Sequence, residues 1–293
     1  MTAFAEDSDF TPENRDPSFK REDEAVSSVG AIPPASPSIG LSVPIAPIEA
    51  VRNPAWTALD VIRIVLMTIL AFIVVFIGLT LLIPGHSFRA RLNGLAVRLG
   101  LQIIGQMCFY VLTLAYMYVL VTRERHQPKF WHAMNWNWPA AVWIYPAVGV
   151  LLQIVFLILE RFLTFPKEVP FDAIFRQPLT ILLVAVFSVT LSPLMEELFF
   201  RGFFYPVVRR HTGIAAAVLA TAIPFALMHA PQYGYSWAAI LLIFIVGVVL
   251  ACVREYSNSL AASFLVHVGY NGTIMMLLFV GTDGFRHFEK LRQ

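Results

Sequence analysis

The stretch from Ile64 to Ile83 contains no charged side chain and consists almost entirely of apolar residues. As an α-helix it would be about 30 Å long, which matches the hydrocarbon core of a bilayer. Such a run is typical of a membrane-spanning helix. The composition agrees with this interpretation, because 58% of the 293 residues are hydrophobic and only 14% are charged. An ordinary soluble domain has about 25% charged residues.

Similar apolar runs recur and predict an all-α fold, a polytopic transmembrane helical bundle with about seven or eight spans. An eighth span would require the tryptophan-rich stretch around Pro139 to enter the bilayer; otherwise this stretch is an interfacial turn. Pro193 is expected to kink the fourth span. The expected spans are Ile64–Ile83, Leu99–Val121, Ala140–Leu159, Pro178–Met195, Ile214–His229, Ser236–Val253 and Leu260–Val280.

Charge is distributed unevenly along the chain. Residues 1–57 hold 4 Lys and Arg against 9 Asp and Glu, a net −5, and the remainder holds 17 against 10, a net +7. Basic residues at the ends of spans are the usual anchors to a lipid bilayer, so we expect a membrane partner and no nucleic acid. Cys108 and Cys252 lie in apolar runs and form neither a disulfide framework nor a metal-binding spacing.

A cluster of charges follows the fourth apolar run. This cluster consists of Glu196, Glu197 and Arg201. Because each charge costs at least about 2.5 kcal/mol in hydrocarbon, we expect these residues to have a function. Glu197 and Arg201 are four residues apart and share a helix face, which favours an ion pair. Glu196 points about 100° away from Glu197 and is free to face another group.

The remaining strongly polar residues of the membrane body lie on two other spans. They are His229 on the fifth span, one turn after Phe225, and His267 with Asn271 on the seventh. A carboxylate base, an imidazole and hydrogen-bond donors are what the hydrolysis of an amide needs. Ser192 and Ser263 lack a nucleophile motif, so activated water is the more economical nucleophile.

Three motifs in chain order carry a resemblance to a known family: Glu196-Glu197-x-x-x-Arg201, Phe225-x-x-x-His229 and His267-x-x-x-Asn271. This arrangement resembles the CPBP family, the CAAX protease and bacteriocin-processing intramembrane endopeptidases, which includes the type II CAAX prenyl endopeptidase. The resemblance covers roughly residues 178–280. It implies a glutamate-type intramembrane endopeptidase that cleaves membrane-associated peptides or proteins, with or without a prenylated CAAX end.

The resemblance also implies a role for each motif residue, with no cofactor and no metal. Glu196 is expected to be the general base that activates water, assisted by His229. The other residues are expected to position that base (Glu197 and Arg201) or to form the oxyanion site (His267 and Asn271). The implied location is the cell membrane of a bacterium, as an integral multi-pass protein.

The predicted organisation has four parts. They are a disordered N-terminal tail (1–57), N-terminal transmembrane helices with an interfacial connector (58–177), a catalytic four-helix membrane core (178–280) and a basic C-terminal tail (281–293). Residues 84–98 are expected to form a basic loop. Residues 160–177 are expected to be either an amphipathic segment on the membrane or a simple loop.

Two other functions stay open at this stage. One is a zinc enzyme that uses His229, His267 and a glutamate, although the chain has no H-E-x-x-H pair. The other is a non-catalytic membrane protein, such as an immunity factor, a scaffold or a carrier, in which the charges form a structural ion pair and the polar residues join helices. Sensitivity to chelators separates the first from a metal-free protease.

Overall fold

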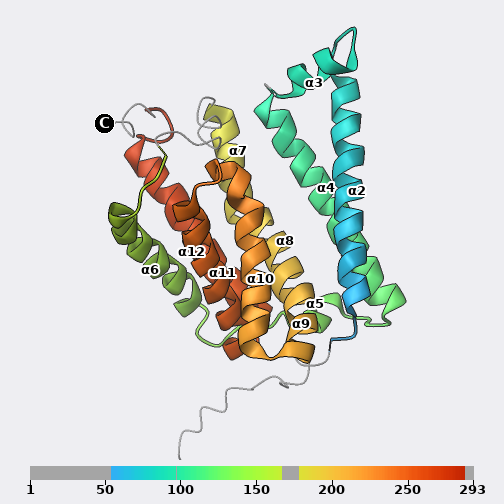
Figure 1. Cartoon of the computed structure of the whole chain (residues 1–293), viewed down its shortest axis with the longest axis vertical. Helices are drawn as coiled ribbons and strands as arrows, with labels where there is room; N and C mark the ends of the chain where they lie inside the picture. The colour runs from blue at the N-terminus through green and yellow to red at the C-terminus, as the bar shows by residue number, and fades with distance from the viewer. Residues whose placement is uncertain (1–53, 97, 167–177, 288–293) are drawn as a thin grey trace, which may run out of the picture. The chain divides into compact units, whose positions relative to one another are not determined.

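The computed structural model describes residues 54–96, 98–166 and 178–287, which lie in one compact unit of the chain, Val43–Gln293 (Figure 1). Every regular element in these ranges is a helix, and seven helices there are long and apolar enough to cross a membrane. The predicted all-α, multi-pass bundle is therefore confirmed. Most of the predicted N-terminal tail, residues 167–177 of the connector and the end of the basic tail lie outside the described residues.

Several of the spans are built from more than one helical piece. In chain order the pieces are α2 (Ala58–Leu82), α3 (Phe88–Ala96), α4 (Leu99–Val119), the π-helix η1 (Leu120–Glu124), α5 (Phe130–Ala133), α6 (Ile144–Leu159), the 3-10 helix η2 (Glu160–Phe162), α7 (Pro178–Val189), α8 (Leu191–Glu197), the π-helix η4 (Leu198–Phe204), α9 (Tyr205–Thr212), α10 (Ile214–His229), the 3-10 helix η5 (Ala230–Tyr233), α11 (Trp237–Ser257) and α12 (Leu260–Gly281). The fifth span agrees with the sequence prediction at both ends.

Helix α2 begins at Ala58, earlier than predicted, so the first span includes two charged residues. Asp60 is fully buried there, and it accepts a hydrogen bond of 2.6 Å from Arg125 at the end of the second span. Asp60 also forms an ion pair with Arg63, at 3.4 Å. Ion pairs with guanidinium groups offset the cost of burying the Asp60 carboxylate at the start of the helix, whereas an unpaired buried carboxylate would be strongly destabilising.

The segment between the first two spans was expected to be a loop, and this is wrong, because it contains the helix α3. Arg91 of α3 donates hydrogen bonds to the carbonyl oxygens of Leu81 at 2.6 Å and Gly85 at 3.1 Å. These bonds satisfy backbone acceptors at the end of α2, which would otherwise need water. Arg91 therefore stabilises the connection between α2 and α3 by binding two of its backbone carbonyl groups.

Two other predicted boundaries are also corrected. The sixth span was expected to end at Val253, but α11 continues to Ser257 and includes Arg254, whose side chain is only 2% exposed. The third span was expected from Ala140, but residues 140–143 form a turn before α6 begins. Charge and tryptophan content therefore mark the ends of spans only approximately.

The fourth span is broken where the sequence predicted a kink. Helix α7 ends at Val189, and Thr190 takes a non-helical conformation with φ −117° and ψ −81° before α8 begins. Pro193 explains the break, because its ring would clash with the carbonyl group of Val189 in a continuous helix. Helix α8 then runs directly into the π-helix η4, a wider turn that is common at functional sites.

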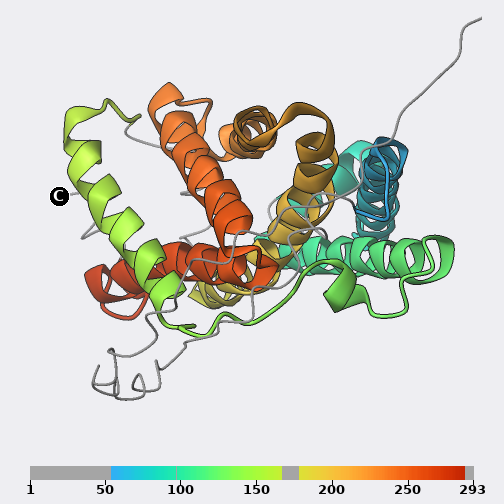
Figure 2. The same ribbon diagram turned by 90° about the horizontal axis from the view of Figure 1, so that it is seen from below.

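The helices fall into two closely packed groups. Helices α2 and α4 lie side by side at one edge, and α6, α10, α11 and α12 lie together at the other side of the broken span (Figures 1 and 2). The crossing of α6 and α12 is very close. A Cβ atom added at Gly269 would lie 2.3 Å from the carbonyl oxygen of Pro146, and one at Gly149 would lie 2.1 Å from that of Val266.

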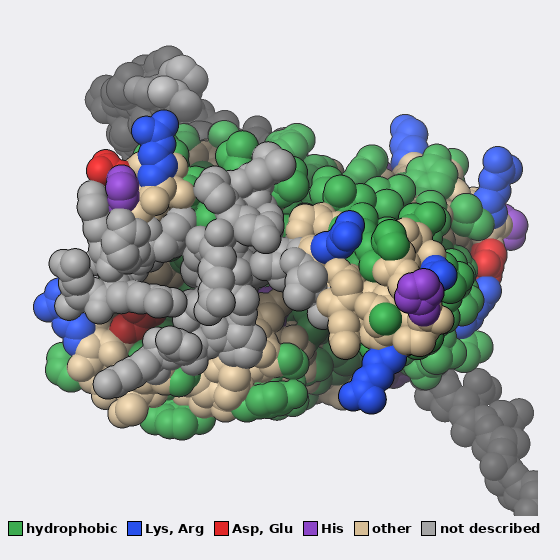
Figure 3. Space-filling view, turned by 90° about the horizontal axis from the view of Figure 1, so that it is seen from above, with side chains coloured by type: hydrophobic (Ala, Val, Ile, Leu, Met, Phe, Trp, Pro, Cys, Tyr) green, Lys and Arg blue, Asp and Glu red, His purple; other side chains and the backbone are tan. Residues whose placement is uncertain are grey.

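The outer surface suits a lipid environment. Large apolar side chains of α2, such as Leu66 and Leu70, are more than half exposed. Seen from above, hydrophobic side chains cover part of the described surface, and Lys and Arg side chains stand out both at the rim and within this face (Figure 3). Exposed apolar helix faces with basic residues at one end are what a membrane protein presents to the bilayer and its headgroups.

Candidate active site

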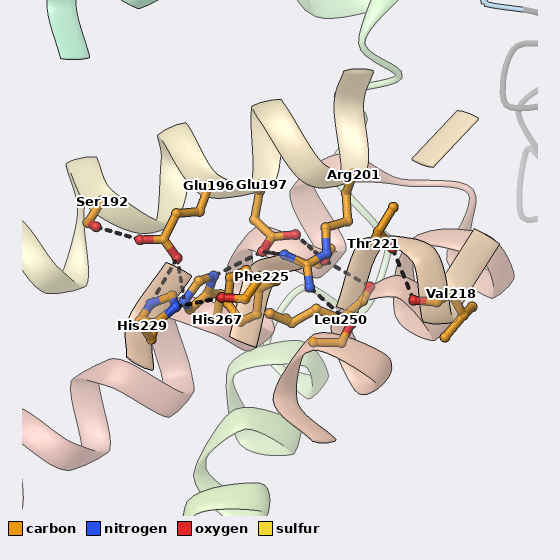
Figure 4. A network of polar contacts seen from close by, with 12 residues as sticks. Ser192, Glu196, Glu197, Arg201, Val218, Thr221, Phe225, His229, Leu250 and His267 are labelled. Atoms are coloured by element: carbon orange, nitrogen blue, oxygen red, sulfur yellow. Dashed lines mark hydrogen bonds and ion pairs between the residues drawn. The ribbon is translucent and has the colours of Figure 1, made fainter. Parts of the chain in front are cut away.

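Three spans meet at the side chain of Glu196 (Figure 4). Glu196 belongs to α8, His229 is the last residue of α10, and His267 lies in the middle of α12. The Glu196 Oε2 atom is 3.9 Å from His229 Nε2 and 3.7 Å from His267 Nε2. The fold thus brings together a carboxylate and two imidazoles that are far apart in the sequence.

The two carboxylate oxygens of Glu196 have different surroundings. Oε1 accepts a hydrogen bond of 2.7 Å from Ser192 Oγ, one turn earlier in α8. Oε2 is buried and has no hydrogen-bond partner among the described residues. Gaps of 3.7 and 3.9 Å are too long for direct hydrogen bonds to the imidazoles, but one water molecule can bridge all three atoms.

Both histidines turn the same nitrogen atom toward Glu196. His229 Nδ1 lies 2.8 Å from the carbonyl oxygen of Phe225, and His267 Nδ1 lies 2.9 Å from Glu197 Oε1. A carbonyl group and a carboxylate can only accept, so each Nδ1 carries a proton and donates it. The Nε2 atoms are then the nitrogens that face the gap beside Glu196 Oε2.

Both carboxylate oxygens of Glu197 have hydrogen-bond partners. Its side chain is completely buried; Oε1 accepts a hydrogen bond of 3.1 Å from Arg201 and Oε2 one of 2.5 Å from Ser263 Oγ. Arg201 is equally buried, donates to the carbonyl oxygen of Gly247 at 2.9 Å and lies 4.5 Å from the centre of the Phe225 ring. The predicted ion pair of Glu197 and Arg201 is confirmed, and it fixes the carboxylate that holds the second histidine.

Asn271 lies one turn beyond His267 on α12, and its position differs from that of the other predicted residues. Its Nδ2 atom donates a hydrogen bond of 2.8 Å to the carbonyl oxygen of Ser188, near the end of α7. This bond ties α12 to the broken span just before Thr190. Asn271 therefore lies beside the site and shares its cavity, without a hydrogen bond to Glu196 in the described structure.

Two cavities approach the site from different sides. The larger, about 460 Å³, is lined by both histidines and Asn271, together with residues of α4, α7 and α11. The smaller, about 200 Å³, is lined by Glu196, Tyr110 and two threonines, and by apolar side chains that include Met195 and Phe200. Glu196 therefore lies in the wall of the smaller cavity and faces the two histidines that line the larger one.

The geometry of the described residues offers no ready-made metal site. Within these ranges no group of three or more His, Cys, Asp or Glu side chains is arranged to hold a metal ion. The zinc alternative thus gains no support from the placement of its expected ligands. The organic groups present, a carboxylate, two imidazoles and an amide, are those of acid–base chemistry.

Sequence reasoning missed two serine residues of the site. Ser192 and Ser263 were considered only as nucleophiles and set aside, yet each donates a hydrogen bond to one of the two glutamates. A signal was present for both, because Ser192 precedes Glu196 by four residues and Ser263 precedes His267 by four. The same helical spacing that predicted the pair of Glu197 and Arg201 applies here.

One comparison with known proteins gives a match. A protein-family model, described as type II CAAX prenyl endopeptidase Rce1-like, matches residues 178–273. This segment is therefore similar to the Rce1-like family. Neither the curated proteins nor the solved structures that were compared include a significant match to the chain.

The Rce1-like segment covers about a third of the chain, from the start of α7 into α12. It contains all six residues that the sequence motifs singled out, and it leaves α2 to α6 outside. The match supports a protease, and therefore a hydrolase, of the CAAX type in general. With seven helices of membrane-spanning length in its described part, the protein is an integral, multi-pass membrane protein.

Proposed function

We propose that the protein is an intramembrane endopeptidase that hydrolyses peptide bonds of membrane-associated substrates, CAAX-type ends among them, with a water molecule activated by Glu196. One observation carries the proposal: the buried Glu196 Oε2 atom, without a partner among the described residues, faces the Nε2 atoms of His229 and His267 at 3.9 and 3.7 Å. The cell membrane of a bacterium as its location is part of the same proposal.

Counting protons supports a definite assignment of roles. With Nδ1 of each histidine donating to Phe225 or Glu197, an ionised Glu196 and two neutral imidazoles present three acceptors to one water. Water has only two hydrogens, so it can donate to two of these groups, and the third can take part in the reaction only as a donor. We propose the donor role for His267, whose ring is hydrogen-bonded to the carboxylate of Glu197. Glu196 and His229 then accept from the water.

The reaction follows from this arrangement. The oxygen of the water attacks the carbonyl carbon of the peptide bond while Glu196 accepts one of its protons. The new oxyanion receives hydrogen bonds from His267 and Asn271. When the C–N bond breaks, the proton held by Glu196 moves to the leaving amine, so the products are one carboxylic acid and one amine.

The test uses purified full-length protein in lipid vesicles and a library of lipid-tethered peptides with and without a prenylated cysteine. Wild type is expected to cleave a subset of the library, and Glu196→Gln is expected to be at least about 100-fold slower, because general-base catalysis contributes about 10² to 10⁴. Glu160→Gln at the exposed end of α6 is the matched control. A Glu196→Gln protein that folds and cleaves at the wild-type rate contradicts the proposal.

A chelator arm separates this mechanism from the zinc alternative. The proposed water mechanism predicts the same rate before and after extensive treatment with a chelator. A rate that falls on chelation and returns when zinc is added back contradicts the metal-free mechanism. Failure of the wild type to cleave any peptide would instead favour a non-catalytic membrane protein.

A further inference from the structure

Helix α4 carries a stripe of polar side chains that the family match does not cover. Gln102, Gln106, Tyr110 and Thr113 are spaced by four, four and three residues, so they lie on one face of the helix. Hydrogen-bonding groups on a membrane-spanning helix usually face the protein interior and have a function. We call these four residues the α4 stripe.

The α4 stripe runs along both cavities of the site. Gln102 and Gln106 line the larger cavity, opposite the two histidines. Tyr110 and Thr113 line the smaller one, which also contains Glu196 in its wall. A single helix face therefore borders the space on each side of the carboxylate that we propose as the base.

Tyr110 connects the stripe to the site itself. Its hydroxyl group lies near the side chains of Gln106 and Ser192, and Ser192 donates to Glu196 Oε1. The stripe therefore reaches a residue that contacts the proposed base directly. The hydrogen bond from Ser192 leaves Oε2 as the oxygen of Glu196 that faces the gap.

Thr113 is the member of the stripe that packing between helices does not explain. A threonine in a helix ordinarily donates to a carbonyl group of the preceding turn, as Thr68 and Thr80 do at 2.8 Å. Thr113 is 3% exposed, yet its hydroxyl group has no partner among the described residues. A buried hydroxyl group on a cavity wall is satisfied when a polar ligand enters the cavity.

We propose that the α4 stripe is the wall that binds the main chain of the substrate. An extended peptide segment runs from the larger cavity to the smaller one past Glu196, with Gln106 and Thr113 bonded to its backbone on either side. Carboxamide and hydroxyl groups both donate and accept, which suits N–H and C=O groups alike. The smaller cavity is otherwise apolar and takes an apolar residue. This inference rests on the proposed function.

Steady-state kinetics with the best-cleaved peptide of the library tests the two contact residues. Gln106→Leu and Thr113→Val are each expected to raise KM about 2- to 12-fold, which is the loss of affinity when one neutral hydrogen bond is removed. The value of kcat is expected to change little, because the bond is made equally in the ground state and in the transition state. Thr113→Ser, which keeps the hydroxyl group, is expected to retain the wild-type KM. Wild-type KM in both Gln106→Leu and Thr113→Val overturns the inference while leaving the proposed function intact.

Matched controls make the same chemical changes away from the cavities. Gln153→Leu on α6 and Thr80→Val on α2 alter buried residues that line neither cavity, and both are expected to keep the wild-type KM. An equal rise of KM in these controls would mean that any buried polar group has this effect, and would overturn the inference.

Photo-crosslinking provides a readout that does not depend on the kinetics. A photoreactive residue replaces Gln106 in the Glu196→Gln background. In a separate protein it replaces Leu112, which is 49% exposed and lies outside the α4 stripe, about 115° around the helix from its centre. The same lipid-tethered peptide is expected to crosslink at position 106 and not at 112. Equal crosslinking at both positions, or none at 106 with a peptide that the wild type cleaves, contradicts the inference.

Discussion

Adjacent residues Glu196 and Glu197 have opposite surroundings, and this contrast divides their roles. Glu197 accepts hydrogen bonds from Arg201, His267 and Ser263, and it is fully buried. Glu196 keeps one oxygen without a partner in the described structure. Helical spacing predicted that the two carboxylates point in different directions. It could not predict their partners on α12, because local spacing carries no information about contacts between distant segments.

The buried ion pair gives a prediction for stability. Arg201→Met leaves the Glu197 carboxylate buried without its guanidinium partner, and this is expected to cost about 3–5 kcal/mol of unfolding free energy. Denaturant unfolding in detergent measures it. Glu124→Gln is the control, because Glu124 and its partner Arg63 are both 38% exposed, and it is expected to change stability far less. Equal losses in the two variants would contradict this account of the pair.

Asn271 gives a prediction for turnover. Its amide group lies one turn from His267 in the larger cavity, and we expect it to bond the oxyanion mainly in the transition state. Asn271→Ala should therefore lower kcat by about 10²- to 10³-fold and change KM much less. Because Asn271 also donates to Ser188, a thermal-unfolding measurement of the same variant is needed. A loss of affinity at unchanged kcat would contradict the oxyanion role.

At the level of helices, the site depends on the break in the fourth span and on the close crossing of α6 and α12. Thr190 interrupts the fourth span, and the π-helix η4 follows the glutamates directly. The sequence indicated the break through Pro193, since the proline ring is incompatible with a continuous helix. It gave no comparable sign of η4, or of the helix α3, because each is held by contacts that the local sequence does not specify.

The crossing of α6 and α12 gives a prediction for packing. Gly269→Ala adds a Cβ atom 2.3 Å from the backbone oxygen of Pro146, so the helices must move apart, at a cost of about 1–3 kcal/mol. Because His267 is two residues away on α12, the rate of cleavage should fall as well. Gly78→Ala on α2 has open space at the added Cβ atom, and its stability should be unchanged or slightly raised.

For the molecule as a whole, the all-α, multi-pass fold could be predicted from the sequence, and the roles of the six site residues stay a prediction. Long apolar runs are decisive evidence of spans, and charges inside them draw attention because hydrocarbon penalises them. The part played by α4 could not be predicted, since its polar stripe acquires meaning only beside the cavities. The division into an N-terminal part and a catalytic core stays a prediction, and the close contact of α6 with α12 crosses that boundary.

The N-terminal region gives a prediction at this scale. Residues 1–42 contain none of the predicted site residues, and their composition is rich in proline, serine and acidic residues. A protein that starts at Val43 is therefore expected to insert into vesicles and to cleave the library peptides with the wild-type kcat/KM. A tenfold loss of kcat/KM at unchanged thermal stability would show that the region takes part in the reaction.

The central claim is that one water is held among Glu196, His229 and His267 inside the membrane. An experimental density map at a resolution that resolves single waters tests it most directly. The account predicts one peak about 2.7–3.2 Å from Glu196 Oε2 and from both Nε2 atoms, the distances of hydrogen bonds. A peak about 2.0–2.2 Å from the three atoms, the distance of a bound zinc ion, or a Glu196 side chain turned away from both histidines, would contradict it.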